Sequence, residues 1–230
     1  MRDYLIFTLS ATLASFGDVA GHERRGSWTW PGRSAILGLV GAALGIDRDG
    51  DFSSLDALAV SVAVFRPGDV LRDFHTVQTV PSAASRKPQS RPHALLEGQG
   101  SLNTTITLRD YRSSVLYGVA ISGDGLKRLA QALERPVFQP YLGRKSCPLN
   151  APLAPQLVPA SSAAEALVRL TLPPWLADAE AGILYADEGE GPGTRIEVRH
   201  DGPLDRIKWH FAPRGVAVQD VTIRPAREKG

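Results

Sequence analysis

Residues 30–46 constrain the fold more than any other stretch, because a turn there leads into an apolar run that contains three glycines. Pro31 suits the first turn of a helix, and the apolar run begins just after Arg33. Each glycine within a helix costs roughly 0.5–1 kcal/mol relative to alanine, so we expect another group to approach closely. At 3.6 residues per turn, the small residues share one face of the predicted helix: Ser34, Gly38, Gly41 and Gly45.

Two compatible interpretations of this glycine face remain open. The first is close packing of the helix on a sheet, which is the usual reason for glycine within a helical pattern. The second adds an anion at the start of the helix, where free N–H groups lie next to Arg33 and Ser34. Such a helix start is suited to a phosphate group.

The composition is that of a globular protein whose basic residues are mostly arginines. The 230 residues suffice for one large domain or two small ones, and the hydrophobic content of 43% is ordinary. Of the 26 lysines and arginines, only five are lysines. Arginine favours planar and bidentate contacts with phosphate, although a GC-rich genome gives the same bias.

Several kinds of site are disfavoured by the sequence. Cys147 is the only cysteine, which excludes an internal disulfide and a multi-cysteine zinc site, and the five histidines are scattered. The apolar run at 5–9 is too short for a secretory signal, and the run at 35–46 is too short to cross a membrane. We therefore expect a cytoplasmic protein without a metal, a cofactor or membrane association.

The first half of the chain predicts alternating strands and helices. A strand at 4–9 precedes the glycine-containing helix, and strands at 58–65 and 70–80 follow it as a hairpin around a Pro-Gly turn. Residues 81–101 have no apolar period and contain basic residues, prolines and glycines, which indicates a mobile loop or finger. Two strands, a helix and a closing strand are then expected at 104–111, 115–121, 126–133 and 138–142. The order strand, helix, strand, strand, helix, strand predicts an α+β fold with a ferredoxin-like domain.

The second half predicts a smaller unit. Residues 149–159 are rich in proline and alanine, as in a linker. Short strands separated by glycine and proline turns are expected at 167–172, 183–185, 194–199, 207–211 and 216–223. We therefore expect a ferredoxin-like domain at 1–148, followed at 149–230 by a linker and a small C-terminal β subdomain.

Catalytic motifs are scarce in this sequence. The stretch around Arg33 lacks the lysine and the glycine spacing of a nucleotide-hydrolysing P-loop. His75 lies in a predicted strand and could act as a general base on a ribose 2′-hydroxyl, with Lys145 or Tyr111 as its partner. A structural or base-stacking role for His75 is the alternative, because nothing in the sequence brings these groups together.

A second stretch of interest is residues 140–149, where Tyr141 is followed by Gly143, Arg144, Lys145 and Ser146. An aromatic ring can stack on a base, two cations can contact phosphates, and glycine permits close approach of the backbone. The same residues also suit an ordinary polar turn. Single-strand RNA binding gains support when other basic segments, at 24–33 and 86–112, belong to the same domain.

Three segments resemble the CasD family, whose members bind the five-prime handle of crRNA in type I-E CRISPR Cascade. They are Pro31-Gly32-Arg33-Ser34 with the apolar run at 37–46, then Leu71-Arg72-Asp73-Phe74-His75-Thr76-Val77, then Tyr141-Leu142-Gly143-Arg144-Lys145-Ser146-Cys147-Pro148. A weaker match covers residues 107–120. The order and spacing of the four matches agree with the family pattern.

The resemblance implies a RAMP-type ferredoxin-like domain with a β-hairpin thumb, here at about 80–112, and a small C-terminal β region. It implies a protein that grips the crRNA handle and packs against CasC backbone subunits and the large CasA subunit. Target DNA would be reached only through the assembled complex. Since CasE processes crRNA in type I-E systems, the family implies no catalysis. The related type I-C subunit cuts precursor RNA, so a metal-independent endoribonuclease is the alternative.

The matched regions and their side-chain chemistry give the candidate RNA-binding residues, while no catalytic or metal-binding residue is predicted. Basic side chains of the first turn, the loops and the thumb are expected at phosphates, and aromatic ones beside bases. For any single basic residue, a solvated surface role is the alternative. The candidates are Arg24, Arg25, Arg33, Ser34, His75, Arg86, Lys87, Arg91, Tyr111, Tyr141, Arg144, Lys145 and Ser146.

Overall fold

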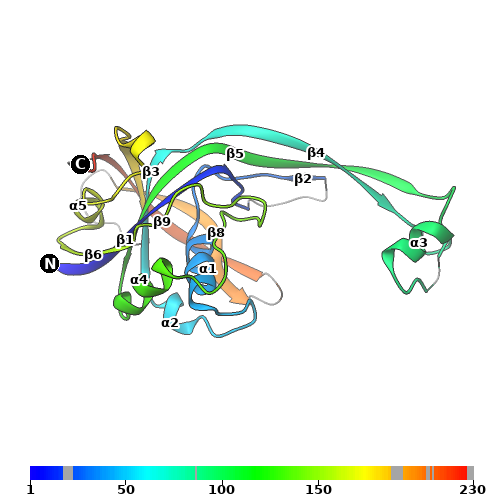
Figure 1. Cartoon of the computed structure of the whole chain (residues 1–230), viewed down its shortest axis with the longest axis horizontal. Coiled ribbons are helices and arrows are strands. Elements are labelled where there is room, and N and C mark those ends of the chain that lie inside the picture. The colour runs from blue at the N-terminus through cyan, green and yellow to red at the C-terminus, as the bar shows by residue number, and fades with distance from the viewer. Residues whose placement is uncertain (18–22, 86, 188–193, 206–207, 209, 227–230) are drawn as a thin grey trace.

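A large, mainly antiparallel sheet forms the centre of the molecule, and a long hairpin projects from it (Figure 1). The computed structural model describes residues 1–17, 23–85, 87–187, 194–205, 208 and 210–226. Within these residues the strands are β1 (Arg2–Ala14), β2 (Arg24–Arg25), β3 (Ala59–Arg66), β4 (Asp69–Thr79), β5 (Asn103–Ser122), β6 (Gln156–Ala160), β7 (Ala181–Ala186), β8 (Arg195–Asp205) and β9 (His210–Ile223). The helices are α1 (Arg33–Leu44), α2 (Ser53–Asp56), α3 (Arg91–Glu97), α4 (Leu126–Glu134) and α5 (Ala163–Leu167), with a 3₁₀ turn at Pro174–Leu176.

The main path of the sheet has the order β6-β1-β5-β3-β7-β9-β8, while β2 and β4 pair with β5 outside that path. Successive side chains of β1 enter two different cores, because residues of a strand alternate between the faces of a sheet. Leu5, Phe7 and Leu9 pack with α1 and α4, whereas Tyr4 and Ile6 pack with residues of α5. The α+β class with a large antiparallel sheet is therefore confirmed.

The predicted order of strand, helix, strand, strand, helix, strand is present as β1, α1, β3, β5, α4 and β6. The closing strand, however, is β6, inside the segment predicted to be a linker. The strand predicted at 138–142 is wrong, since Tyr141 makes only an isolated bridge with Pro148. β6 pairs with the outer edge of β1, with Tyr4 opposite Val158.

The hairpin predicted between 58–65 and 70–80 is also wrong. β3 pairs with residues 116–122 of β5, whereas β4 pairs with residues 103–113 of the same strand. The turn at Gly68, which has a φ of 73°, directs the chain away from β3. A single long strand, β5, therefore replaces the two strands expected at 104–111 and 115–121, and Ser114 with a φ of 57° lies between its two parts.

The projecting hairpin consists of β4 and residues 103–113 of β5, with α3 at its tip (Figure 1). It starts earlier than the predicted thumb at 80–112. Its tip is partly ordered into a helix, because the Ser90 side chain accepts a hydrogen bond from the backbone N–H of His93 at 3.3 Å and Pro92 suits the first turn. The segment predicted to be a mobile loop or finger thus contains a capped helix.

The C-terminal strands extend the same sheet instead of forming a separate one among the described residues. β7 pairs with β3, β9 pairs with β7, and β8 pairs with β9. The sheet therefore runs across the boundary predicted between residues 148 and 149. The strand predicted at 167–172 is wrong, because α5, capped by the Ser162 side chain, ends at Leu167 and residues 168–172 form a turn and irregular chain. No helix in the described residues has the length and apolar character that crossing a bilayer requires.

The glycines of α1 have different roles. A side chain at Gly41 would place its Cβ 2.5 Å from the ring of Phe52, so close packing explains this glycine. Gly45 ends the helix in the left-handed conformation, with a φ of 76°. Gly38 has no atom within 4 Å of an added Cβ. Close packing therefore explains Gly41, but against Phe52 before α2 and not against the sheet, and an added Cβ at Gly45 would also lie 3.0 Å from Val137.

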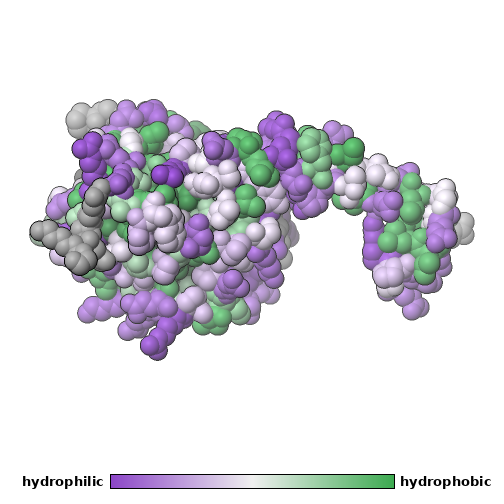
Figure 2. All heavy atoms as spheres, turned by 45° about the horizontal axis from the view of Figure 1, so that its top comes forward, coloured by the Kyte–Doolittle hydropathy of each residue, from purple (hydrophilic) through white to green (hydrophobic). Residues whose placement is uncertain are grey.

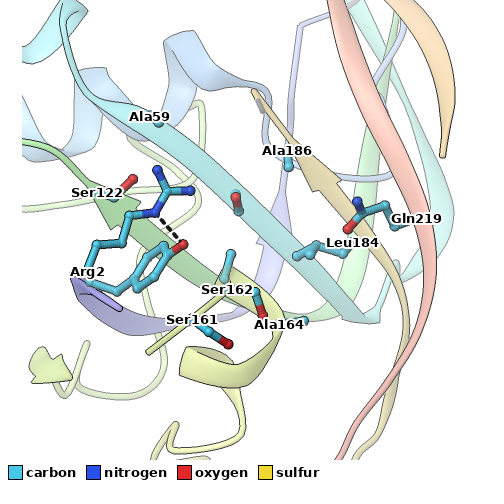
Figure 3. A pocket seen from close by; sticks show the side chains of 12 residues that line it. Arg2, Ala59, Ser122, Ser161, Ser162, Ala164, Leu184, Ala186 and Gln219 are labelled. Carbon is cyan, nitrogen blue, oxygen red and sulfur yellow. Dashed lines mark hydrogen bonds between the residues drawn. The ribbon is translucent and has the colours of Figure 1, made fainter. Parts of the chain in front are cut away.

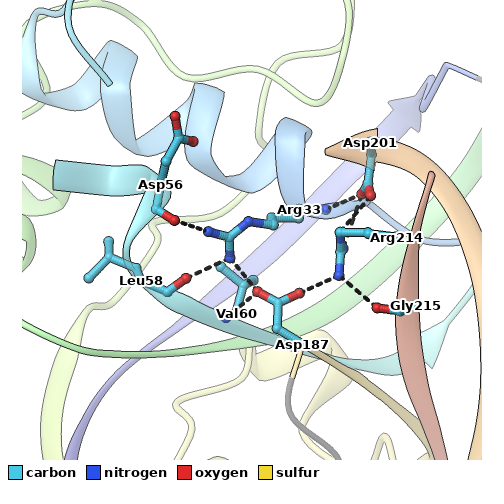
Figure 4. A network of polar contacts seen from close by, with 8 residues as sticks. All are labelled: Arg33, Asp56, Leu58, Val60, Asp187, Asp201, Arg214 and Gly215. Atoms are coloured by element: carbon cyan, nitrogen blue, oxygen red, sulfur yellow. Dashed lines mark hydrogen bonds and ion pairs between the residues drawn. The ribbon is translucent and has the colours of Figure 1, made fainter. Parts of the chain in front are cut away.

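A network of ion pairs ties the start of α1 to the C-terminal strands (Figure 4). The Arg33 guanidinium contacts the Asp187 carboxylate, which also accepts hydrogen bonds from the backbone of Val60 at 2.9 Å and from Arg214 at 2.6 Å. Arg214 in turn donates to Asp201 at 2.7 Å. The side chains of Arg33 and Asp187 are only 12% and 15% exposed, so removing the Asp187 carboxylate would leave the Arg33 charge largely buried without an opposite charge.

We expect Asp187→Ala to lower the free energy of unfolding by about 3–5 kcal/mol, because Arg33 then keeps a largely buried charge without a carboxylate. Chemical denaturation monitored by circular dichroism measures this change. Asp220→Ala is the control, since its side chain is 80% exposed and its contact with Arg195 is 3.7 Å long. The control should cost no more than about 1 kcal/mol. Equal losses in the two variants would contradict the importance of the network.

Candidate nucleic-acid interface

Three strands lie side by side where the hairpin leaves the body. β2 pairs in parallel with β5, placing Arg25 opposite Arg109, and β4 pairs with the other side of β5, placing Arg72 opposite Asp110. Because side chains alternate along each strand, this ribbon has two faces. We call them the Tyr111 face, with Arg25, Leu71, His75 and Arg109, and the Asp110 face, with Arg24, Arg72, Phe74 and Leu108.

The loop at 141–148 closes over the Tyr111 face. The Arg144 guanidinium lies 4.6 Å from the centroid of the Tyr111 ring, a cation–π contact that fixes both side chains. The backbone N–H of Ser15 donates to the Leu142 carbonyl at 3.1 Å, which anchors the loop to the residue that follows β1. Cys147 is fully buried, and this burial raises the pKa of its thiol, so Cys147 contributes packing as a neutral group.

Two arginines of the Tyr111 face retain donors without a partner. Among the groups that the structure describes, neither the buried Nη1 of Arg144 nor the buried Nε of Arg109 has a hydrogen-bond acceptor. Buried donors are normally satisfied, by protein groups or by ordered water, so each of these two atoms needs a water or another acceptor that the described residues do not supply. Arg25 lies next to Arg109 across the β2–β5 pair. This face therefore carries Arg25, Arg109 and the Arg144–Tyr111 pair, with the acidic Asp73 opposite Arg109.

The structure brings only part of the predicted set together. Arg144 contacts Tyr111 on the Tyr111 face, where the register also places Arg25, opposite Arg109. The exposed side chains of Lys145 and Ser146 belong to the same loop as Arg144. Tyr141, 37% exposed, lies at the start of that loop.

Other predicted residues lie apart from that group. Arg24 lies on the Asp110 face, whereas Lys87 and Arg91 lie near the tip of the hairpin, where Arg91 donates to the backbone carbonyl of Gln78. Arg86 lies outside the described residues. Arg91 and Lys87 are thus remote from the loop at 141–148 along the hairpin.

Arg33 and Ser34 occupy a different part of the body. Besides Asp187, the Arg33 guanidinium donates to the backbone carbonyls of Leu58 at 2.6 Å and Asp56 at 2.7 Å. The backbone N–H of Arg33 donates to the Asp201 carboxylate at 2.8 Å. A phosphate at this helix start would have to displace that carboxylate, so phosphate binding by Arg33 and Ser34 stays a prediction.

His75 lies on the Tyr111 face but farther along the hairpin. Its Nε2 is 2.5 Å from the Asp73 carboxylate. In the ladder His75 is opposite Thr107, whereas Tyr111 is opposite Leu71. Four residues of strand at about 3.3 Å each separate the two positions by roughly 13 Å. His75 and Tyr111 are therefore too far apart to share one proton transfer.

Asp110 is a functional candidate that the sequence did not reveal. Its buried carboxylate accepts hydrogen bonds from Arg72 Nε at 2.8 Å and from Arg24 Nη2 at 3.0 Å. The hydrogen bond from Arg72 is the main cause that lowers the pKa of Asp110 to about 2, with a smaller contribution from Arg24 and opposition from burial. This cluster becomes evident only once β4 is known to pair with β5, and the sequence pattern had paired that strand with residues 58–65 instead.

Within the described residues, neither a metal-binding group nor the hollow beside α5 marks a different site. No group of histidine, cysteine, aspartate and glutamate in the described ranges is arranged to hold a metal ion. Figure 3 shows an open hollow beside α5, lined mainly by serine and alanine, where Arg2 donates to the Tyr4 hydroxyl at 2.7 Å. None of the described candidate residues lines it.

We expect Gly143→Ala to disrupt the loop at 141–148. Gly143 has a φ of 84°, and an added Cβ would lie 1.8 Å from the Ser15 carbonyl oxygen. Gly125→Ala is a matched control, since its φ of 75° is similar but no atom lies within 4 Å. The left-handed conformation alone costs about 1–2 kcal/mol for a residue with a side chain. In thermal unfolding Gly143→Ala should lose more stability than Gly125→Ala; equal losses would contradict the tight contact with Ser15.

The low pKa of Asp110 predicts a stability change in acid. Because the pKa is about 2 in the folded protein and about 3.9 in an unfolded chain, the ionised carboxylate stabilises the fold above about pH 4. This contribution is lost as the pH falls from about 4 to about 2. Asp110→Asn should lack that part of the pH dependence, whereas Asp69→Asn on the same hairpin should retain it. Urea denaturation across this pH range measures the difference.

Comparison with known proteins places these features in a family. The family described as CRISPR-associated protein (Cas_Cas5) matches residues 4–226. A relative from Escherichia coli (strain K12), the CRISPR system Cascade subunit CasD, is 32% identical over 93% of this chain and 94% of its own length.

Solved structures agree with this match. One, described as a CRISPR RNA-guided surveillance complex, superimposes with a TM-score of 0.70 at 24% identity, covering 98% of this chain and 95% of the other, and supports the fold. A second, described as the crystal structure of a Cas protein, gives a TM-score of 0.62 at 27% identity, covering 96% and 95%. The chain belongs to the Cas5 family of CRISPR-associated proteins.

Proposed function

We propose that this protein is the CasD subunit of a type I-E Cascade complex and that its RAMP-type ferredoxin-like domain binds the five-prime handle of crRNA without cutting it. The likeness to a relative named as a Cascade subunit, over nearly the full length of both chains, supports the assignment to the complex. The Tyr111 face supports the assignment to RNA.

The observation that carries the proposal is the arrangement of Arg144 over Tyr111. The ring holds the guanidinium in place, while the buried Nη1 has no acceptor among the described groups. Arg109 adds a second such donor on the same face. Single-stranded RNA is bound by this mixture of arginine and aromatic groups, in which rings stack on bases and guanidinium groups contact phosphates. Lys145 and Ser146 border the surface from the loop.

We favour RNA binding without cleavage over an endoribonuclease activity. A metal-independent ribonuclease needs a general base and an acid close to the same ribose and phosphate. His75 with Asp73 resembles an oriented base, which is the observation in favour of an endoribonuclease. One of its two proposed partners, Tyr111, lies roughly 13 Å away along the ladder, at about 3.3 Å per residue, and is held beneath Arg144. The other, Lys145, belongs to the loop at 141–148 and its pairing with His75 stays a prediction.

The projecting hairpin supports assembly with other subunits. Along the arm, hydrophobic and hydrophilic side chains alternate on the surface (Figure 2), and Leu96 near its tip is 66% exposed. We propose that CasC backbone subunits and the large CasA subunit cover parts of this surface. In this assignment the protein is cytoplasmic, meets target DNA only in the assembled complex and requires no cofactor.

The test is binding and cleavage of labelled repeat RNA and handle RNA by the purified chain in EDTA. We expect salt-dependent binding of intact RNA. Each lost contact with a phosphate of a single strand should reduce the slope of log K against log salt by about 0.7. Arg144→Ala and Lys145→Ala should weaken binding, whereas Arg128→Ala, an exposed arginine of α4, is the matched control.

Two outcomes would contradict the proposal. Site-specific cleavage that is lost in His75→Ala would make the protein a processing endoribonuclease. Equal binding by Arg144→Ala and Arg128→Ala would show that the Tyr111 face is not the RNA surface.

A further inference from the structure

The Asp110 face of the hairpin base carries a second cluster of arginines. Arg24 comes from β2 and Arg72 from β4, and both donate to the carboxylate of Asp110 on β5 between them. Arg24 uses Nε and Nη2 at 3.3 and 3.0 Å, and Arg72 uses Nε and Nη2 at 2.8 and 3.2 Å. One buried carboxylate thus fixes two cations on opposite sides of the strand.

Each of these arginines keeps one end free for a ligand. The Nη1 atoms of Arg24 and Arg72 make no hydrogen bond to any group that the structure describes, and their side chains are 60% and 39% exposed. The cluster of two guanidinium groups and one carboxylate has a net charge of +1. It therefore presents two positioned donors and a surplus positive charge to solvent, which suits a phosphate backbone.

An exposed aromatic ring adjoins the two arginines. Phe74 is 69% exposed and lies opposite Leu108, while Arg24 lies opposite Leu108 on its other side. Val70 and Ile106, both 56% exposed, belong to the same face by their register. Fixed cations beside an exposed aromatic ring are the combination with which proteins bind single strands, where rings stack on bases and cations meet phosphates.

We propose that the Asp110 face is a second binding surface for single-stranded nucleic acid, with Arg24 and Arg72 at phosphates, Phe74 stacked on a base, and Asp110 as the positioning residue. This inference rests on the proposed function and extends it to the opposite side of the hairpin. The ligand is a flexible phosphodiester strand with unpaired bases. A guide RNA and a displaced or target DNA strand share this chemistry.

The proposal predicts an unusual direction for the change in binding affinity when Asp110 is replaced. Simple charge attraction predicts that replacing an aspartate by asparagine near a nucleic acid tightens binding. A positioning role predicts the opposite, because Arg24 and Arg72 lose the group that holds them in place and must be ordered again when the strand binds. The direction of the Asp110→Asn effect therefore separates positioning from general electrostatics.

The experiment measures the affinity of the full-length chain for labelled oligo(U) and oligo(dT) of equal length over a series of salt concentrations. The variants are Phe74→Ala, Arg72→Ala and Asp110→Asn. Asp69→Asn is the matched control, since it also removes an acid from the hairpin but its side chain holds no arginine of the face. Thermal unfolding of each variant tests whether the fold is intact. If Asp110→Asn fails to fold, Phe74→Ala and Arg72→Ala still test the proposal, because both side chains are exposed.

Phe74→Ala should weaken binding about 5-fold to 100-fold, the range for loss of one stacked base. Arg72→Ala should reduce the salt slope by about 0.7. Asp110→Asn should weaken binding, and Asp69→Asn should not. A loss confined to oligo(U) assigns the face to the guide strand, and a loss with oligo(dT) as well includes a DNA strand; both support the proposal.

The inference is wrong if Phe74→Ala and Arg72→Ala bind like the wild type while Arg144→Ala does not, and in that case the proposed function stands. It is also wrong if Phe74→Ala only prevents copurification with the other subunits of the complex, because the face then binds protein. If the wild type binds neither oligonucleotide, or if the variants of both faces bind as well as the wild type, the proposed RNA binding and this inference are both wrong.

Discussion

The length and register of β5 are the constraint on which the rest of the structure depends. Its residues 116–121 lie between β1 and β3 in the body, and its residues 103–113 pair with β4 outside the body. The same strand therefore builds the core and the hairpin. Because side chains alternate along a strand, a shift of register by one residue would exchange the two faces of the hairpin and separate Arg144 from Tyr111.

Strongly periodic elements could be predicted from the sequence, whereas strand partners could not. The apolar runs of α1 and α4 and the β-branched run of β3 are local signals, and their positions were predicted closely. β6 was missed because it contains Pro159 and resembles a linker. An edge strand tolerates proline, since one side of its backbone needs no partner. The turn at Gly68 was predicted correctly, but the hairpin inferred from it was not. The partner of β4 lies in β5, beyond the tip of the arm.

The same limit applies to the candidate interface. The loop at 141–148 and Tyr111 were predicted because aromatic and basic residues cluster in the sequence, and the structure brings Arg144 onto Tyr111. Arg33 was predicted from its place at a helix start, yet its side chain is held by Asp187 from a distant strand. Asp110 was not predicted, because an acidic residue has no evident place in an anion-binding surface until its register shows which cations it holds.

The order of strands has a consequence for how the protein is made. Both sides of the central group β1, β5 and β3 are completed by late segments, with β6 next to β1 and β7 next to β3. While the ribosome is still translating residues beyond 148, the emerging chain exposes two unpaired strand edges rich in apolar residues. Such edges promote association between chains. The nascent protein must therefore stay protected from its neighbours until the C-terminal third has been synthesised, and a fragment ending at 148 would carry that exposure permanently.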